Sequence, residues 1–308
     1  MRIIRHASTG TTPTAIAIGS FDGVHRGHAA LLGLVRTRAA ERGLASAVFT
    51  FELLPREFFS PASAPGRITS LHERLDLIGR LGIDIAFIQR FNASFAALSP
   101  DAFAQRLHAV HGCRHIVIGE DFRYGARRMG NAASLVASGK RLGFEVEVLP
   151  AVRAGAERIS STAVREALAC GDFDQAAQLL GRRYAITGHV VHGAKRGRTL
   201  GFPTANVRLA RPKPALQGVF AVKCFGAATR GLEGVASLGI NPAVASGGPA
   251  TLEAFLFDFS GDLYGRRLTI EFVKKLRDEA HFASLDELAA QIRRDCDMAR
   301  EALRVTGS

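Results

Sequence analysis

Two patterns of apolar residues divide this chain. In residues 1–183, short continuous apolar runs alternate with segments whose apolar positions recur at helical spacing. Continuous runs are typical of parallel strands that are buried on both faces. We expect strands at 15–18, 46–51, 83–88, 115–118 and 144–149. This alternation predicts a doubly wound α/β domain whose ligand-binding loops follow the carboxyl ends of the strands.

The clearest helix of this first part follows Ser99. Ser99 can cap the helix, and Pro100 suits the first helical position. Phe103, Leu107 and Val110 then recur at helical spacing, so they predict the buried stripe.

From residue 184 the pattern changes to short strands separated by glycine-containing turns. The candidate strands are 184–191, 219–225, 234–238, 251–259 and 268–273. Such a series predicts an antiparallel barrel or sandwich. We place the domain boundary near residues 182 and 183, which gives domains 1–183 and 184–308.

A helix is expected at the end of the chain. Ser284 and Glu287 have the spacing of a capping box, and Leu285, Leu288 and Ile292 predict one apolar face. We expect this face to pack against the barrel.

The most informative motif is GSFDGVHRGH, which runs from Gly19 to His28 directly after the first predicted strand. A helical stripe follows it, so His25 and His28 stand at a helix N-terminus, where free N–H groups and the helix dipole favour phosphate. The motif matches neither GxGxxG nor GxxxxGK[ST]. An ordinary turn with solvated histidines remains an equal alternative on these residues alone.

Two other loops of the first domain carry polar residues. IGEDFRYG follows the strand 115–118, and its plain interpretation is a connection between elements. ISSTAVR places Ser160, Ser161 and Thr162 before a helix, with Arg165 one turn later. Hydroxyl residues at this position usually cap a helix. The same arrangement can also hold a triphosphate, because Arg165 supplies positive charge.

The second domain contains the loop HGAKRGRTLGFPTAN at 192–206. Its glycines allow close backbone approach and its basic residues supply positive charge, although a solvated basic hairpin is the simpler explanation of the charges. Thr204 and Asn206 place two neutral oxygen ligands on one face of an extended segment. Such ligands, together with phosphate and water, suit magnesium.

A candidate base lies on a later strand of this domain. Alternation with period two puts Glu253 on the same face as Phe255, Phe257 and Phe259. A carboxylate on an aromatic face is costly to desolvate unless it has a partner or a chemical task. A solvated strand end, or a structural arginine facing Glu253, would explain the residue equally well.

Composition narrows the class of protein. A chain of 308 residues with 47% hydrophobic content is long enough for two cores. Its net charge of +12 is shared by both halves without a basic tail, so we expect anionic small ligands and no nucleic-acid partner. The four cysteines form no CxxC pair. The chain shows no membrane span and no signal-peptide core, so we expect a cytoplasmic protein.

The order of these motifs resembles the prokaryotic bifunctional riboflavin kinase/FAD synthetase family over essentially the whole chain. The motifs in question are GSFDGVHRGH, GEDFRYG, ISSTAVR, RGRTLGFPTANV, GVFAV, FDFSGDLYGRRL and FVKKLRDE. The first of them also resembles the HxGH signature of the nucleotidyl transferase superfamily. The resemblance implies that the N-terminal domain adenylylates FMN to FAD with ATP. It implies that a C-terminal six-stranded barrel phosphorylates riboflavin with magnesium and a second ATP.

The resemblance also assigns site residues. In the first domain, His25 and His28 would stabilise the transition state at the α-phosphate, and Asp121 would contact the flavin. The nucleotide-binding residues there would be Gly19, Phe21, Asp22, Ser160, Ser161, Thr162 and Arg165. In the barrel, Glu253 would be the base and Arg277 would contact the flavin. The residues holding magnesium and ATP there would be Thr204, Asn206, Gly193, Lys195, Gly197 and Arg198.

The barrel departs from the family pattern at one strand. Where many relatives read GVANIGTRPT, this chain reads GVASLGINPAV, so that Ser237, Ile240 and Asn241 replace Asn, Thr and Arg. One alternative is therefore an FMN adenylyltransferase with an inactive kinase barrel. A second, of another class, is a regulatory protein that keeps a flavin fold and binds nucleic acid. The sequence does not indicate the oligomeric state.

Overall fold

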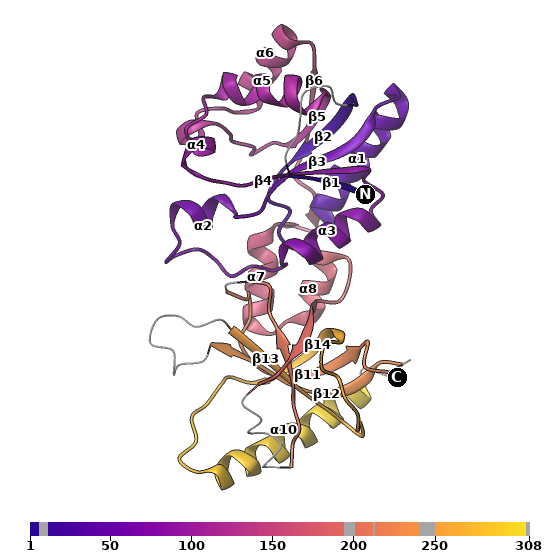
Figure 1. Cartoon of the computed structure of the whole chain (residues 1–308), viewed down its shortest axis with the longest axis vertical. Coiled ribbons are helices and arrows are strands. Elements are labelled where there is room, and N and C mark those ends of the chain that lie inside the picture. The colour runs from indigo at the N-terminus through magenta and orange to yellow at the C-terminus, as the bar shows by residue number, and fades with distance from the viewer. Residues whose placement is uncertain (6–11, 194–200, 212, 229, 241–249, 306–308) are drawn as a thin grey trace. The chain divides into compact units, whose positions relative to one another are not determined.

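The computed structural model describes residues 1–5, 12–193, 201–211, 213–228, 230–240 and 250–305 (Figure 1). The chain forms two compact units. The first contains residues 1–65 and 71–160, and the second contains residues 66–70 and 161–308. The helices before the barrel are thus grouped with it, and the boundary at residue 183 stays a prediction.

The first unit is built on a parallel six-stranded sheet. Its strands are β1 (Arg2–Ile4), β2 (Thr14–Ile18), β3 (Ala45–Phe51), β4 (Ile85–Gln89), β5 (Cys113–Gly119) and β6 (Glu145–Leu149). Their order is β1-β4-β3-β2-β5-β6, so the chain builds outward from β2 first on one side and then on the other. The five predicted strands are confirmed, and the doubly wound architecture with them. The loops after β2 and β5 lie at the point where the strand order reverses, the usual place for a ligand in such sheets.

Helices cover both faces of this sheet. They are α1 (Arg26–Arg42), α2 (Pro55–Phe59), α3 (Leu71–Arg80), α4 (Ala93–Ala96), α5 (Pro100–His111) and α6 (Ala132–Leu142). A 3-10 helix, η1 (Ala126–Arg128), and a short hairpin of β7 (Arg153–Ala154) and β8 (Glu157–Arg158) complete the unit. The predicted cap of α5 is confirmed, because the Ser99 hydroxyl accepts a hydrogen bond from the N–H of Ala102 at 3.1 Å.

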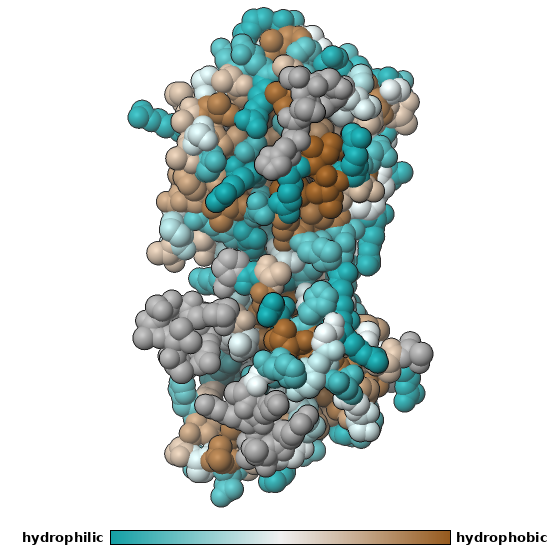
Figure 2. Space-filling view, viewed as in Figure 1, coloured by the Kyte–Doolittle hydropathy of each residue, from teal (hydrophilic) through white to brown (hydrophobic). Residues whose placement is uncertain are grey.

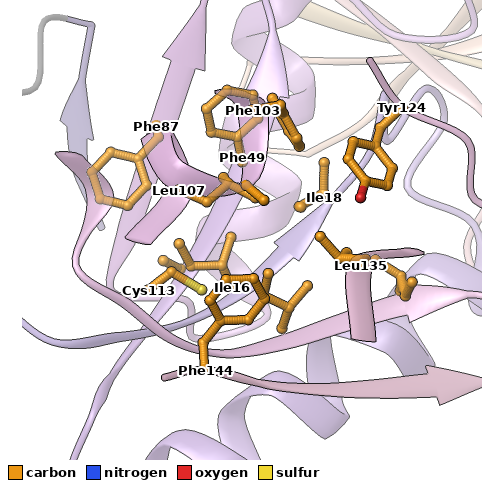
Figure 3. Close-up of a cluster of buried hydrophobic side chains, with 14 of the residues drawn as sticks. Ile16, Ile18, Phe49, Phe87, Phe103, Leu107, Cys113, Tyr124, Leu135 and Phe144 are labelled. Atoms are coloured by element: carbon orange, nitrogen blue, oxygen red, sulfur yellow. The ribbon is translucent and has the colours of Figure 1, made fainter. Parts of the chain in front are cut away.

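Strand β2 is buried on both faces, as its continuous apolar run predicts. Ile16 and Ile18 belong to a cluster that includes Phe49, Phe87 and residues of α5 and α6 (Figure 3). Ala15 and Ala17, which point to the other face, belong to a second cluster that is formed with α1 and α3. The sheet therefore separates two cores, and β2 contributes to both.

One histidine lies inside the first core. His111 is 5% exposed and its ring packs edge-on to Phe49 and Phe87. Neither ring nitrogen has a hydrogen-bond partner among the residues described. Burial, and secondarily the charge of Arg106, lowers the pKa of His111 to about 4. The imidazole is therefore neutral in the folded protein at neutral pH.

This burial predicts a loss of stability in mild acid. The unfolded chain takes up a proton near the ordinary histidine pKa of 6.5, whereas the folded chain resists it until about pH 4. The free energy of unfolding should therefore fall by about 3 kcal/mol as the pH is lowered from 6.5 to about 4. Denaturant unfolding at several pH values tests this prediction. His111→Phe should make the free energy of unfolding depend less on pH, whereas the control His72→Phe, on the surface, should leave that dependence unchanged. An unchanged slope in His111→Phe would contradict the assignment.

The described part of the second unit is a closed antiparallel barrel with helices before and after it. Its strands are β9 (Ala185–Val191), β10 (Ala205–Arg208), β11 (Gly218–Phe225), β12 (Leu232–Ile240), β13 (Ala250–Leu256) and β14 (Arg267–Arg277). They close in the order β10-β13-β12-β11-β14-β9. The helices are α7 (Ser161–Cys170), α8 (Phe173–Leu180) and α10 (Leu285–Val305). The predicted barrel is confirmed, and β10 is the strand that the sequence pattern missed.

Helix α10 packs against the outside of the barrel. Its residues Ala299 and Leu303 share a buried cluster with Val219 and Phe257. The N-terminal cap is present, because the N–H of Glu287 donates to the Ser284 hydroxyl at 3.2 Å. The predicted apolar face was wrong at its first position. Leu285 is 62% exposed, because the buried stripe starts one turn later, at Ala289.

No described helix is long and apolar enough to cross a bilayer. On the face shown in Figure 2, hydrophilic residues are spread over both units and intermingle with apolar ones.

Candidate active sites

The loop after β2 is held in a tightly constrained conformation. Phe21 and Val24 have φ values of 49° and 42°, a region that residues other than glycine seldom adopt. Phe21 is fully buried, Asp22 is 2% exposed, and the N–H of Gly19 donates to the carbonyl of Phe49 at 3.1 Å. Strained residues in a buried loop persist only where the surroundings hold them, and they are often found at ligand sites.

This loop delivers two histidines to the N-terminus of α1, as predicted. His25 is the N-cap, and its Nδ1 accepts a hydrogen bond from the N–H of His28 at 3.3 Å. The two rings stack with centroids 3.7 Å apart and planes inclined by 16°. Gly27 leaves room for this arrangement, because a Cβ there would lie 3.1 Å from Nδ1 of His25, a tight contact. The two imidazoles thus form one surface beside the free N–H groups of the helix.

The environment keeps His28 neutral. Burial is the main reason that its pKa lies well below the ordinary value, and the charges of His25 and Arg74 lower it further. The Nδ1 atom of His28 is buried and has no hydrogen-bond partner in the described part of the chain. A neutral imidazole keeps one N–H that can donate to a phosphate oxygen, and the site gains its positive potential from the helix terminus.

The other first-domain candidates lie on separate elements. Asp121 follows β5, the strand next to β2, and forms an ion pair with Arg158 at 2.9 Å between two exposed side chains. Helix α7 begins at Ser161, so Ser160 precedes it as predicted, whereas Ser161 and Thr162 lie in its first turn and not before it. Ser160 belongs to the first unit, whereas Ser161 and the rest of α7 belong to the second. Roles for these residues in binding flavin or nucleotide stay predictions.

Arg165 has structural contacts of its own. Its Nε donates to the carbonyl of Gly66 at 2.7 Å, and its Nη1 donates to the carbonyl of Ser161 at 3.1 Å. Thr162 is exposed in the same first turn of α7. The guanidinium therefore has a structural role inside the second unit. Its role in binding the triphosphate stays a prediction.

On the barrel, the predicted kinase residues come together. Asn206 on β10 lies directly opposite Glu253 on β13. The Thr204 hydroxyl donates to Oε2 of Glu253 at 3.4 Å. Gly193 packs against this group, since a Cβ there would lie 2.3 Å from Oδ1 of Asn206. The amide of Asn206 and the hydroxyl of Thr204 thus supply neutral oxygens of the kind that suit magnesium, and the carboxylate of Glu253 lies beside them.

The face of Glu253 is as predicted with respect to Phe255 and Phe257, whereas Phe259 lies beyond the end of β13 at Leu256. Along β13 the even-numbered residues fill the barrel, whereas Thr251, Glu253 and Phe255 lie on its outer face. The Phe255 ring contacts Phe202 and Phe257, with centroids 5.5 and 6.0 Å apart. Glu253 is partly exposed beside these rings.

The departure from the family pattern falls next to this carboxylate. Ser237 on β12 lies opposite Glu253, on the other side from Asn206, and its hydroxyl donates to Oε1 of Glu279 at 3.3 Å. Asn241 and the side chain of Ile240 lie outside the described residues, as do Lys195, Gly197 and Arg198.

Arg277 makes contacts that the sequence did not indicate. Its Nε and Nη2 donate to the two carboxylate oxygens of Asp295 on α10, at 2.9 and 2.8 Å. Asp295 is 2% exposed and also accepts a hydrogen bond from Gln291 at 2.8 Å. This pair fastens the terminal helix to the end of β14. A flavin contact by Arg277 stays a prediction.

Removing this carboxylate should weaken the second unit. Asp295→Ala removes the carboxylate that pairs with Arg277, and we expect a loss of about 2–4 kcal/mol in the free energy of unfolding. Asp297→Ala changes an exposed carboxylate of the same helix and should cost less than about 0.5 kcal/mol. Denaturant unfolding of the two variants checks this. If Asp295→Ala and Asp297→Ala unfolded with the same free energy, the stabilising role of Asp295 would be contradicted.

Comparison with known proteins identifies both units. A model of FAD synthetases matches residues 8–163, and a model of riboflavin kinases matches residues 180–303. Bifunctional riboflavin kinase/FMN adenylyltransferases from Escherichia coli K12 and Haemophilus influenzae are 44% and 42% identical to this chain. The alignments cover 94% and 93% of the chain, respectively, and 93% of each relative. The chain belongs to this bifunctional family.

A solved structure extends the similarity to the fold of the whole chain. The crystal structure of a Streptococcus pneumoniae protein named for macrolide efflux matches with a TM-score of 0.78 at 29% identity. The match covers 97% of this chain and 99% of that one. The family resemblance seen in the motifs is thus confirmed, and the presence of both catalytic domains favours the bifunctional enzyme over either alternative.

Sequence reasoning missed two charged residues near the proposed sites. Arg74 interrupts the apolar stripe of α3 beside Leu75 and Ile78, which is the signal that could have singled it out. Glu279 reaches Ser237 from the segment after β14, and no local pattern marks that contact.

Proposed function

We propose that each domain performs one ATP-dependent step of flavin cofactor synthesis. The barrel transfers the γ-phosphate of ATP to riboflavin and yields FMN. The α/β domain transfers the adenylyl group of a second ATP to FMN and yields FAD and pyrophosphate. The observation that carries this proposal is the presence of two differently built sites in one chain: a carboxylate with neutral oxygens on the barrel, and stacked histidines at a helix N-terminus.

The barrel site suits transfer to an alcohol. The terminal ribityl hydroxyl of riboflavin is a weak nucleophile, so Glu253 accepts its proton as the new O–P bond forms and ADP leaves. Thr204 and Asn206 are the residues that would hold magnesium. Bound there, magnesium would neutralise phosphate charge. Thr204 also donates to Glu253, which orients that carboxylate.

The histidine site suits transfer to an existing anion. The phosphate of FMN is already a nucleophile, so attack at the α-phosphorus needs alignment and charge stabilisation more than a base. His25 and His28 donate to the oxygens of the α-phosphate while the bond to pyrophosphate breaks. A cytoplasmic location fits the cysteines of the described chain, none of which is in a disulfide.

A product assay tests both steps together. Purified protein is mixed with riboflavin, ATP and magnesium, and the flavins are separated by chromatography over time. FMN should appear first and FAD later, and omission of magnesium should stop FMN formation. FAD formed from supplied FMN, with none from riboflavin, would show an inactive barrel. No product from either flavin would overturn the proposal.

A further inference from the structure

Arg74 is the most deeply buried charged side chain of the first unit's described residues, and the two reactions proposed above do not use it. It lies on α3 and is 1% exposed, between apolar residues that pack against the sheet. A buried guanidinium is costly to desolvate unless hydrogen bonds satisfy it. The acceptors of those hydrogen bonds therefore indicate what the residue is for.

The guanidinium of Arg74 connects the ends of two neighbouring strands. Its Nη1 donates to the carbonyl of Ser20, the second residue of the loop that carries the histidines. Its Nη2 donates to the carbonyl of Phe51, the last residue of β3, at 2.5 Å. The carbonyl of Ser20 also accepts the hydroxyl of Thr50 at 3.5 Å. This carbonyl is thus held from two sides, just before the strained turn at Phe21.

We infer that Arg74 is a positioning residue of the adenylyltransferase site, because it fixes the loop after β2 and thereby the two stacked histidines. The inference rests on the proposed adenylyl transfer by this domain. Residues with positive φ, such as Phe21 and Val24, need surroundings that hold them in place. Arg74 stabilises this conformation, since its planar guanidinium can donate hydrogen bonds to two carbonyls at once.

The charge of Arg74 supports the same role. Its positive charge is one of the influences that lower the pKa of His28, after burial and His25. Loss of Arg74 would therefore loosen the loop and also remove a charge that favours the neutral imidazole.

Arg74→Met should separate the two activities of the chain. We expect the kcat for FMN adenylylation to fall about 10- to 100-fold, because small misplacements of catalytic groups have effects of this size. The KM for FMN should change less than about threefold. Riboflavin phosphorylation should keep the wild-type kcat, which also shows that the barrel is folded. Arg74→Lys should retain a higher kcat for FMN adenylylation than Arg74→Met, since lysine keeps the positive charge but cannot donate to both carbonyls in the same geometry.

The controls make the outcome decisive. Arg80→Met, at the exposed end of the same helix, should keep both activities. Thermal unfolding reports whether each variant is folded. If Arg74→Met does not fold, the test uses Arg74→Lys instead, and we expect its kcat for FMN adenylylation to be at least fivefold below that of the wild type. Undiminished adenylylation in the folded variant, or parallel loss of both activities, would overturn the inference. Wild-type protein that makes no FAD from FMN would instead overturn the proposed function.

Discussion

Glu253→Gln is expected to lower the kcat for riboflavin phosphorylation by about 10²- to 10⁴-fold, with FMN adenylylation unchanged. Glutamine keeps the shape of the side chain and an oxygen that can accept from Thr204, but it cannot take the proton of the ribityl hydroxyl. The register that places Glu253 opposite Asn206 is set by the backbone of β10 and β13, so the cation site should remain. The two activities are measured on the same protein with riboflavin and FMN as separate substrates.

The matched control is Glu233→Gln on β12, which changes an exposed glutamate of the same barrel. This variant should phosphorylate riboflavin at the wild-type rate. Substantial kinase activity in Glu253→Gln would show that another group takes the proton. Loss of both reactions in a folded Glu253→Gln protein would contradict the assignment of the two reactions to separate domains.

The elements that sequence reasoning located are those whose cause is local. The run 15–18 is apolar at every position because both faces of β2 are covered, and the cap at Ser99 needs only the four residues that make it. The histidines at the start of α1 follow from the glycines before them and the apolar stripe after them. Such features are complete within one turn or strand, so one sequence is enough to predict them.

The features that were missed depend on distant partners. Strands β1 and β10 have three and four residues, too few for a pattern, and each exists because a longer strand pairs with it. Leu285 follows the helical period but is 62% exposed, because the buried stripe of α10 starts at Ala289. Periodicity indicates which residues share a face and not how far the opposite surface extends.

The same limit applies to the sites. The period-two pattern of β13 predicted the face of Glu253, but only the barrel register brings that carboxylate to Asn206. Arg277 shows the same limit, because no pattern indicated its pairing with Asp295 on α10, while the flavin contact that the family resemblance implies stays a prediction. The charge of an arginine can be read from sequence, whereas its acceptor is chosen by packing.

The largest effect on the other reaction is expected from His28→Ala. The variant should form FMN from riboflavin at the wild-type rate and convert it to FAD about 10²- to 10³-fold more slowly, so that FMN accumulates. His28 lies in the first turn of α1, stacks on His25 and stays neutral, so its N–H can meet charge that develops on the α-phosphate. Alanine keeps the helix but removes that donor.

Time courses of FMN and FAD from riboflavin check this expectation directly. His72→Ala, which removes an exposed histidine from α3, is the control and should leave both time courses unchanged. Since the two reactions share one chain, the undiminished supply of FMN shows that the variant is active and confines the defect to the second step. Equal slowing of both steps in a folded His28→Ala protein would mean that the histidine acts on stability, and its catalytic assignment would fail.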